Sequence, residues 1–148
     1  MFELVVLGRG DKDIFDVKKI LVPTDGSMHS LKAAEYAAEI SKQFDAETHL
    51  LNVITKSTIR ISRKREEKSS VQALEETKDV FEEWGVKVIL RKTVRGNPAQ
   101  IICKIAEEEG FDLIVIGSRG LSGIKSFFLG GVSDKVIRYA ICPVLIVR

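Results

Sequence analysis

Apolar and polar residues follow two different periods along this chain, and the two periods alternate from beginning to end. Short apolar runs predict buried strands at residues 18–23, 47–54, 86–94, 111–116 and 143–147. Longer segments with apolar residues three or four apart predict helices at about residues 30–44, 69–84, 98–110 and 132–139. Asn97 followed by Pro98 is typical of a helix start, because asparagine caps the first turn and proline suits its first position.

Strands that alternate with helices in this way predict right-handed crossovers between parallel strands. The predicted fold class is α/β: a doubly wound parallel five-stranded sheet of order 3-2-1-4-5, with helices on both faces. In such a sheet a ligand binds beyond the carboxyl ends of the strands, where the strand order reverses. We therefore expect Asp25, Val53 and Gly117 to lie around one crevice.

Two glycine clusters follow the fourth predicted strand. Residues 117–120 read Gly-Ser-Arg-Gly, and residues 130–131 are a glycine pair just before the last predicted helix. Glycine permits φ > 0 and close approach of the backbone, so free N–H groups are expected to face a ligand there. The positive end of the helix dipole would point toward the same space. The pattern predicts a phosphate-binding loop.

Each of these positions also has a purely structural interpretation. Asp25 follows a strand and would equally serve as the cap of the next helix. The glycines would be ordinary loop residues, and Val53 would simply be buried in the sheet. Other ligand loops and nucleophile motifs do not fit: the glycines lack the G-K-[ST] of a Walker loop, and no G-x-S-x-G is present.

The glycine spacing resembles that of the universal stress proteins, whose nucleotide-binding members carry a G-x2-G-x9-G-[ST] signature. Gly117, Gly120 and Gly130 stand at those spacings, and Val132-Ser133 follows. The opening segment 20–27 (ILVPTDGS) and the closing segment 142–147 (CPVLIV) also match. Gly131 departs from the pattern, because the family has serine or threonine there.

The resemblance implies an adenine nucleotide, ATP or AMP/ADP, possibly with Mg, bound without a Walker loop. Asp25 would lie near the ribose, the backbone around Val53 near the adenine, and both glycine clusters around the phosphates. The candidate binding residues are Pro23, Thr24, Asp25, Val53, Gly117, Ser118, Arg119, Gly120, Gly130, Gly131, Val132 and Ser133. Gly131 costs the site one hydroxyl donor, which Ser118 or Ser133 would have to replace.

Three functions remain open at this point. The first is an ATP-binding stress-response or signalling module that acts as a homodimer. The second is a slow ATPase or autophosphorylating enzyme, although no dedicated catalytic base stands out. The third is an interaction module without nucleotide binding, for which Gly131 is the only indication.

Composition narrows the choice of partners. The 148 residues, 45% hydrophobic and 30% charged, fit one soluble domain, and the net charge of +2 gives no broad field for nucleic acid or membrane. The basic cluster at residues 60–65 is followed by two glutamates and has no aromatic residue, so a solvated segment is expected there. Cys103 and Cys142 lack metal or redox spacing and are expected to be buried. No secretory signal or membrane span is expected, which favours a cytoplasmic location.

The two ends of the chain carry two further expectations. Residues 1–17 form a predicted N-terminal extension whose apolar run 4–7 would add an edge strand or a covering arm, and residues 18–148 form the predicted domain. In the resembling family the last strand pairs with its copy in a second chain. Residues Pro143 to Val147 are therefore the expected homodimer contact.

Overall fold

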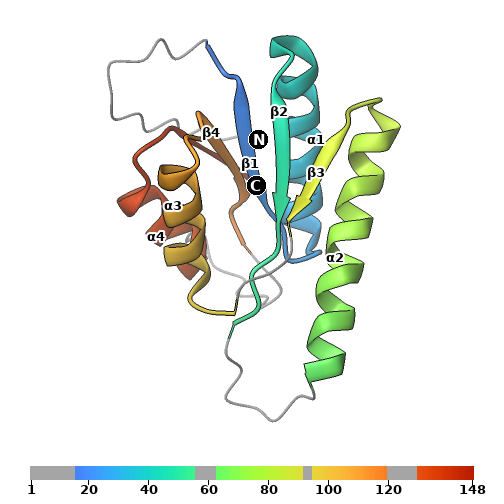
Figure 1. The fold of residues 1–148 in the computed structure, drawn as a ribbon, viewed down its shortest axis with the longest axis vertical. Helices are drawn as coiled ribbons and strands as arrows, with labels where there is room; N and C mark the ends of the chain where they lie inside the picture. Colours follow the sequence, from blue (N-terminus) through green and yellow to red (C-terminus); the bar gives the residue numbers. More distant parts are fainter. Residues whose placement is uncertain (1–15, 56–62, 92–94, 120–129) are drawn as a thin grey trace.

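The computed structural model describes residues 16–55, 63–91, 95–119 and 130–148. Strands and helices alternate along the chain: β1 Lys19–Pro23, α1 Met28–Phe44, β2 Glu47–Leu51, α2 Arg63–Glu83, β3 Val88–Arg91, α3 Pro98–Glu108, β4 Leu113–Gly117, α4 Gly131–Tyr139 and β5 Val144–Val147. All strand pairs are parallel, and the sheet order is β3-β2-β1-β4-β5 (Figure 1). The predicted fold class and strand order are confirmed.

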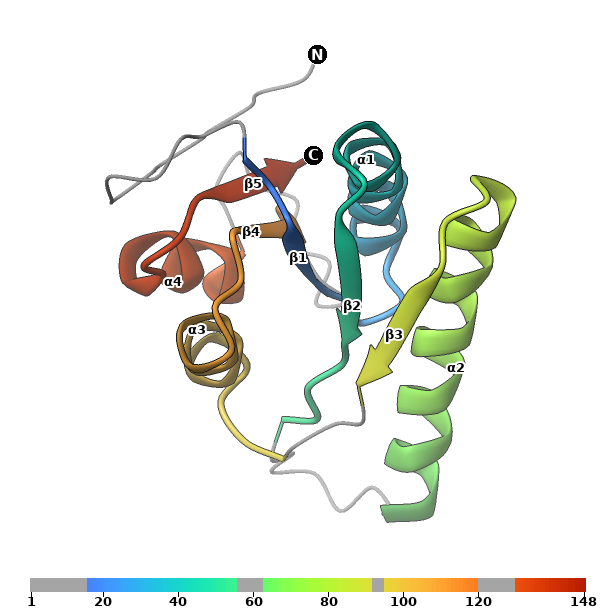
Figure 2. The same ribbon diagram turned by 45° about the horizontal axis from the view of Figure 1, so that its top comes forward.

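Alternate strand residues face two separate hydrophobic cores, as expected for a parallel sheet covered on both sides. In β1, Ile20 and Val22 pack under α1 and α2, whereas Leu21 packs against α3 and α4. The two helix pairs lie on opposite faces of the sheet (Figure 2). The predicted covering of both faces of the sheet by helices is therefore confirmed.

Helix α1 approaches the sheet closely because small side chains face it. Ala33, Ala34, Ala37 and Ala38 are all completely buried. At the end of β4 the contact involves backbone alone: a Cβ on Gly117 would lie 2.7 Å from the carbonyl carbon of His29. Glycine is required at residue 117 because the first turn of α1 occupies the space of a side chain.

Local capping explains where the helices begin. Ser27 is the N-cap of α1 and accepts a hydrogen bond from the Ser30 N–H. The residue before it, Gly26, has φ +78°, and an added Cβ would lie 3.2 Å from the Cβ of Ala73 in α2. Asn97 caps α3 as predicted and accepts from the Gln100 N–H at 3.2 Å.

Helix α2 begins earlier than predicted, at Arg63 instead of residue 69. Arginine, lysine and glutamate are strong helix formers, so these turns need no apolar stripe to be helical. Their end of α2 extends past the carboxyl ends of the strands (Figure 1). The expected solvated character of the basic cluster is confirmed at Lys64 and Arg65, which are exposed, but these residues are helical; residues 60–62 lie outside the described residues.

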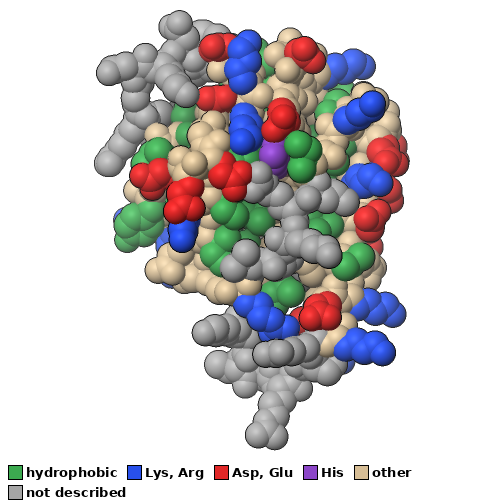
Figure 3. Space-filling view, viewed as in Figure 1, with side chains coloured by type: hydrophobic (Ala, Val, Ile, Leu, Met, Phe, Trp, Pro, Cys, Tyr) green, Lys and Arg blue, Asp and Glu red, His purple; other side chains and the backbone are tan. Residues whose placement is uncertain are grey.

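The surface mixes both signs of charge over the face shown in Figure 3. In the described part of the chain no helix is long and apolar enough to cross a membrane. The predicted edge strand 4–7 lies outside the described residues, and the division at residue 17 and the cytoplasmic location remain predictions.

The two thiols differ in burial. Cys142 is 8% exposed, and burial raises its pKa to about 11. Cys103 is half-buried, with its pKa raised mainly by burial and further by Glu107. Both thiols therefore remain protonated at neutral pH, and the packing role expected from the sequence is confirmed for Cys142.

The tight contact at Gly117 gives a direct test. Gly117→Ala would place a methyl group 2.7 to 2.9 Å from backbone atoms of His29 and Ser30, which cannot move independently of α1. We expect a loss of about 1–3 kcal/mol in the free energy of unfolding, measured by urea denaturation. Gly131→Ala is the matched control, because a Cβ there meets no atom within 4 Å. Equal stability of the two variants would contradict the close approach of α1.

Candidate functional site

A cavity of about 590 Å³ opens at the carboxyl ends of the strands. It forms where β1 and β4 separate: their pairing stops at Leu21 and Ile114, although both strands continue. The predicted binding residues in its lining are Pro23, Thr24, Asp25, Val53, Gly117, Arg119, Gly130, Gly131, Val132 and Ser133. Ser118 is buried behind the lining, and Gly120 lies outside the described residues. The strand order and the glycine spacing thus lead to one cavity.

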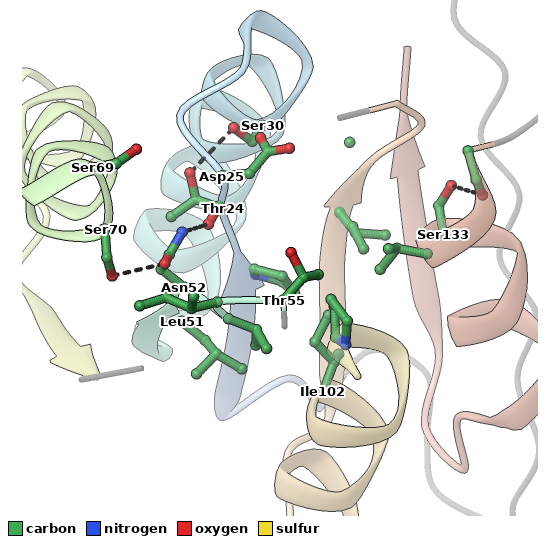
Figure 4. Close-up of a pocket in the computed structure, with 18 of the residues that line it drawn as sticks. Thr24, Asp25, Ser30, Leu51, Asn52, Thr55, Ser69, Ser70, Ile102 and Ser133 are labelled. Carbon is green, nitrogen blue, oxygen red and sulfur yellow. Dashed lines mark hydrogen bonds between the residues drawn. The ribbon is translucent and has the colours of Figure 1, made fainter. Parts of the chain in front are cut away.

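The cavity has an apolar part next to the end of β2. Val53 and Ile54 line it from the segment that follows β2, Pro98 and Ile102 from α3, and Ile116 from β4. Ile102 faces this space in the close-up of Figure 4. Apolar walls that face each other across a cavity of this size suit a flat heterocycle.

The opposite wall is the N-terminus of α4, which carries free donors. The first helical hydrogen bond runs from the Asp134 N–H to the Gly130 carbonyl at 3.0 Å. The N–H groups of residues 131–133 precede that bond and have no acceptor within the helix. Gly130, the N-cap, provides no side-chain cap. Three backbone donors and the positive end of the helix dipole therefore face the cavity, an arrangement that attracts an anion.

The glycines differ in two respects from the predicted cradle. Among the described glycines positive φ occurs at Gly26, Gly85 and Gly110, while Gly130 has φ −62°. The expected left-handed backbone is thus wrong at positions 117, 130 and 131. Glycine is needed at 117 for close packing, and a Cβ on Gly130 would lie 3.1 Å from the carbonyl oxygen of Ser118.

Two N–H groups of the predicted cradle are already used within the protein. The Ser118 N–H donates to the Val147 carbonyl at 2.7 Å, and the Gly130 N–H donates to the Ser118 carbonyl at 2.7 Å. The Ser133 hydroxyl lies 2.9 Å from the Ser118 carbonyl and 3.0 Å from that of Gly130. Its single proton is therefore engaged, and Ser133 is not the substitute phosphate donor for the hydroxyl missing at 131.

Asp25 lines the cavity and does not cap α1. Its Oδ1 accepts the Ser27 N–H at 2.9 Å, which closes the turn before the helix, and the cap itself is Ser27. The helix-cap interpretation of Asp25 is wrong. Its carboxylate is half-buried at the cavity, where it can accept hydrogen bonds from a ligand.

A buried polar network supports this wall and joins three elements. The Asn52 side-chain amide donates to the Thr24 carbonyl at 2.7 Å and accepts from the Ser70 hydroxyl at 2.8 Å (Figure 4). The Thr24 hydroxyl lies 2.7 Å from that of Thr77 and 3.2 Å from that of Ser30. These polar groups of Thr24 face the protein interior, so its role is to join β1 to α1 and α2.

Sequence reasoning missed this network and the wall beside it. Asn52 directly follows the apolar end of β2, so the rule that located Asp25 would also have located it. Arg65, Glu66 and Ser69 of α2 line the cavity as well. Arg65 and Glu66 were missed because the helix was predicted to begin only at residue 69.

The sequence predicts no residues that bind a metal ion by themselves. Within the described ranges no group of three or more His, Cys, Asp or Glu side chains is placed to hold a metal ion. Asp25 and Glu66 are the carboxylates among the described lining residues.

Comparison with known proteins agrees with the fold. The model of the universal stress protein family matches residues 16–148. Universal stress protein MJ0531 of Methanocaldococcus jannaschii is 41% identical over 141 residues, covering 88% of this chain and 82% of that protein. Universal stress protein YxiE of Bacillus subtilis is 37% identical over 148 residues, covering 88% of this chain and 98% of that protein. A crystal structure of a universal stress protein in complex with cAMP superposes with a TM-score of 0.73 at 27% identity, covering 90% of this chain and 98% of that chain.

The buried network predicts a stability effect at Asn52. Asn52→Ala leaves the Thr24 carbonyl and the Ser70 hydroxyl without the partner they have in the structure. We expect the free energy of unfolding to fall by about 1–3 kcal/mol, measured by urea denaturation. Ser69→Ala, at an exposed neighbouring position in α2, is the control and should leave stability nearly unchanged. A loss no larger than that of the control would mean that Asn52 does not join β1 to α2.

Proposed function

Because this chain belongs to the universal stress protein family, we propose that its cavity binds an adenine nucleotide, with ATP as the physiological ligand. The observation that carries the proposal is the uncapped N-terminus of α4 facing an apolar recess across one cavity. Such a site accepts a ligand with one anionic end and one flat apolar end. The relative of 27% identity whose structure contains cAMP supports an adenine base.

In the proposed arrangement the phosphates lie against α4. The N–H groups of residues 131–133 provide donors, and the Arg119 side chain at the cavity adds positive charge. The base would then occupy the recess between Val53 and Ile102. Asp25 stands between these ends and would accept hydrogen bonds from the ribose hydroxyls, as the resemblance implied.

Magnesium would depend on the phosphates for most of its coordination. Mg²⁺ commonly binds through one or two carboxylates together with substrate phosphates and water. Asp25, which lines the cavity at the end of β1, is the carboxylate that would take part in this coordination. A magnesium requirement is therefore expected for ATP and not for AMP.

We propose a regulatory function for the bound nucleotide, in which occupancy changes the affinity of a dimer for a protein partner. The first experiment is mass analysis of small molecules released from purified protein, followed by calorimetric titration with ATP, ADP and AMP. Saturable binding supports the proposal, and absence of both bound and titratable nucleotide refutes it. Multiple-turnover phosphate release above a buffer blank would instead favour the slow ATPase.

Gly131 offers a test of where the phosphates lie. A serine there would place a hydroxyl beside the first turn of α4, and a Cβ meets no atom within 4 Å. One added hydrogen bond to a charged phosphate is worth about 1.5–3 kcal/mol at best, which is roughly ten- to a hundredfold in dissociation constant. We expect Gly131→Ser to bind ATP more tightly, with a smaller gain for AMP.

Calorimetric titration of both proteins with both nucleotides decides the position of residue 131. Gly131→Ala is the matched control, since it adds the Cβ without the hydroxyl. Equal gains for ATP and AMP, or a gain that the alanine variant reproduces, would mean that residue 131 does not face the terminal phosphates.

We also propose that β5 pairs with its copy in a homodimer. Among the described residues β5 ends the sheet, next to β4. Pro143 and Val147 accept hydrogen bonds from β4, so by alternation the N–H groups of Val144 and Ile146 point to the outer edge. The side chains of β5 are buried within the single chain, Ile146 being only 3% exposed. The proposed contact is therefore mainly between backbones.

A backbone substitution tests this contact better than a charged side chain, which would disrupt the core at Ile146. Ile146→Pro removes the outward N–H at an edge position, where proline is tolerated. We expect a shift of the mass in light scattering at micromolar concentration from dimer toward monomer. Ile146→Val loses side-chain volume and keeps the N–H, so it should remain dimeric. A wild-type monomer, or equal dimerisation of both variants, would contradict the proposed contact.

A further inference from the structure

The first two turns of α2 form a wall of the cavity that lies outside the glycine signature. Arg65, Glu66 and Ser69 line the cavity from these turns. Figure 4 shows Ser69 on one side of the close-up and Ser133 of α4 on the other. We propose that Glu66 determines base specificity by accepting a hydrogen bond from the amino group of the bound adenine. This inference rests on the proposed nucleotide site.

Glu66 differs from its neighbours in burial. Lys64, Arg65, Glu67 and Lys68 are exposed, whereas the Glu66 side chain is only 12% exposed. It is the one residue of this charged stretch that turns toward the protein. Removal of a charged carboxylate from water costs free energy, so acidic side chains are buried only where they have partners.

The known partner of Glu66 is Arg95, and this contact fixes where the carboxylate lies. Glu66 Oε2 forms an ion pair with Arg95 Nη1 at 2.7 Å, without hydrogen-bond geometry, and is shielded from solvent. Arg95 in turn forms a parallel bridge with Ile54, and the Gly96 N–H donates to the Ile54 carbonyl at 3.1 Å. The carboxylate is therefore anchored beside the end of β2, which is the apolar part of the cavity.

The chemistry of the Glu66 carboxylate determines which group of a ligand can bind to it. An ionised carboxylate only accepts hydrogen bonds, and its two oxygens offer about four lone-pair sites. Oε2 is ion-paired with Arg95, and Glu66 lines the cavity, so the carboxylate retains acceptor capacity for a ligand there. A fully ionised phosphate has no proton to donate to this carboxylate, whereas the exocyclic amino group of adenine is a donor of suitable polarity. Glu66 thus favours the orientation of the nucleotide in which the base lies near the end of β2 and the phosphates lie at α4.

The test compares two nucleotides that differ in one group. ATP and purine riboside 5′-triphosphate are identical except for the 6-amino group. We expect wild-type protein to bind ATP about ten- to a hundredfold more tightly, the range for one charge-assisted hydrogen bond. Glu66→Met keeps side-chain length and helix propensity but removes the acceptor, so the preference should fall to near unity.

Glu67→Met is the matched control, because it makes the same charge change at an exposed position of the same turn. It should retain the wild-type preference for ATP. Circular dichroism checks that each variant is folded, and Glu66→Gln, a neutral acceptor, should show an intermediate preference.

Each other outcome has a defined meaning. If Glu66→Met weakens both nucleotides equally, or keeps the wild-type ratio, Glu66 only anchors α2 and the proposal is wrong. If its effect appears instead in the ratio of ATP to 2′-deoxy-ATP, Glu66 contacts the ribose, and the proposal is again wrong. Failure of the wild-type protein to bind either triphosphate would refute the nucleotide site itself, which is a different result.

Discussion

The separation of β1 from β4 is the constraint on which the site depends. The two strands pair only at Ile20–Leu113 and Leu21–Ile114, whereas β1 pairs with β2 along its whole length. Beyond that point the backbone of a central strand would be left with unpaired polar groups, which is costly inside a protein. The side chain of Asn52 meets part of this need by donating to the Thr24 carbonyl. The cavity is thus a consequence of strand order. The polar network supplies hydrogen bonds to the backbone that borders it.

Hydrogen bonds within the protein also determine which backbone N–H groups remain available to a ligand. The loop after β4 is fastened to β5 and to the start of α4 through the N–H groups of Ser118 and Gly130. A cradle built from those groups would have to break these bonds on binding, at the expense of the sheet edge. The free donors lie instead in the first turn of α4, where helix geometry leaves them without acceptors. Structural glycines and ligand-facing donors therefore occupy adjacent but different positions.

Much of this arrangement could be predicted from the sequence, and the exceptions have physical causes. Buried strands and amphipathic helices differ in the period of their apolar residues, so the elements and the parallel sheet could be predicted, and Asn97 marked a helix start correctly. The first turns of α2 have no apolar stripe that would reveal a helix, because they bury little apolar surface. Asn52 and Glu66 were missed because their roles depend on contacts across the fold. A glycine alone does not reveal whether it serves φ > 0, close packing or a ligand, as Gly26, Gly117 and Gly131 show.

Gly131 illustrates how a family signature can change without removal of the site. Its backbone N–H is fixed by the helix and not by the residue type, so serine and glycine place this donor alike. The hydroxyl adds one hydrogen bond of a few kcal/mol at most, against a site that also offers two further N–H groups and Arg119. In the proposed arrangement, loss of the hydroxyl would act mainly on the terminal phosphates, while the base would depend on α2 and on the segment after β2. Affinity for the base and affinity for the phosphates would then be set by separate elements, and each could vary without the other.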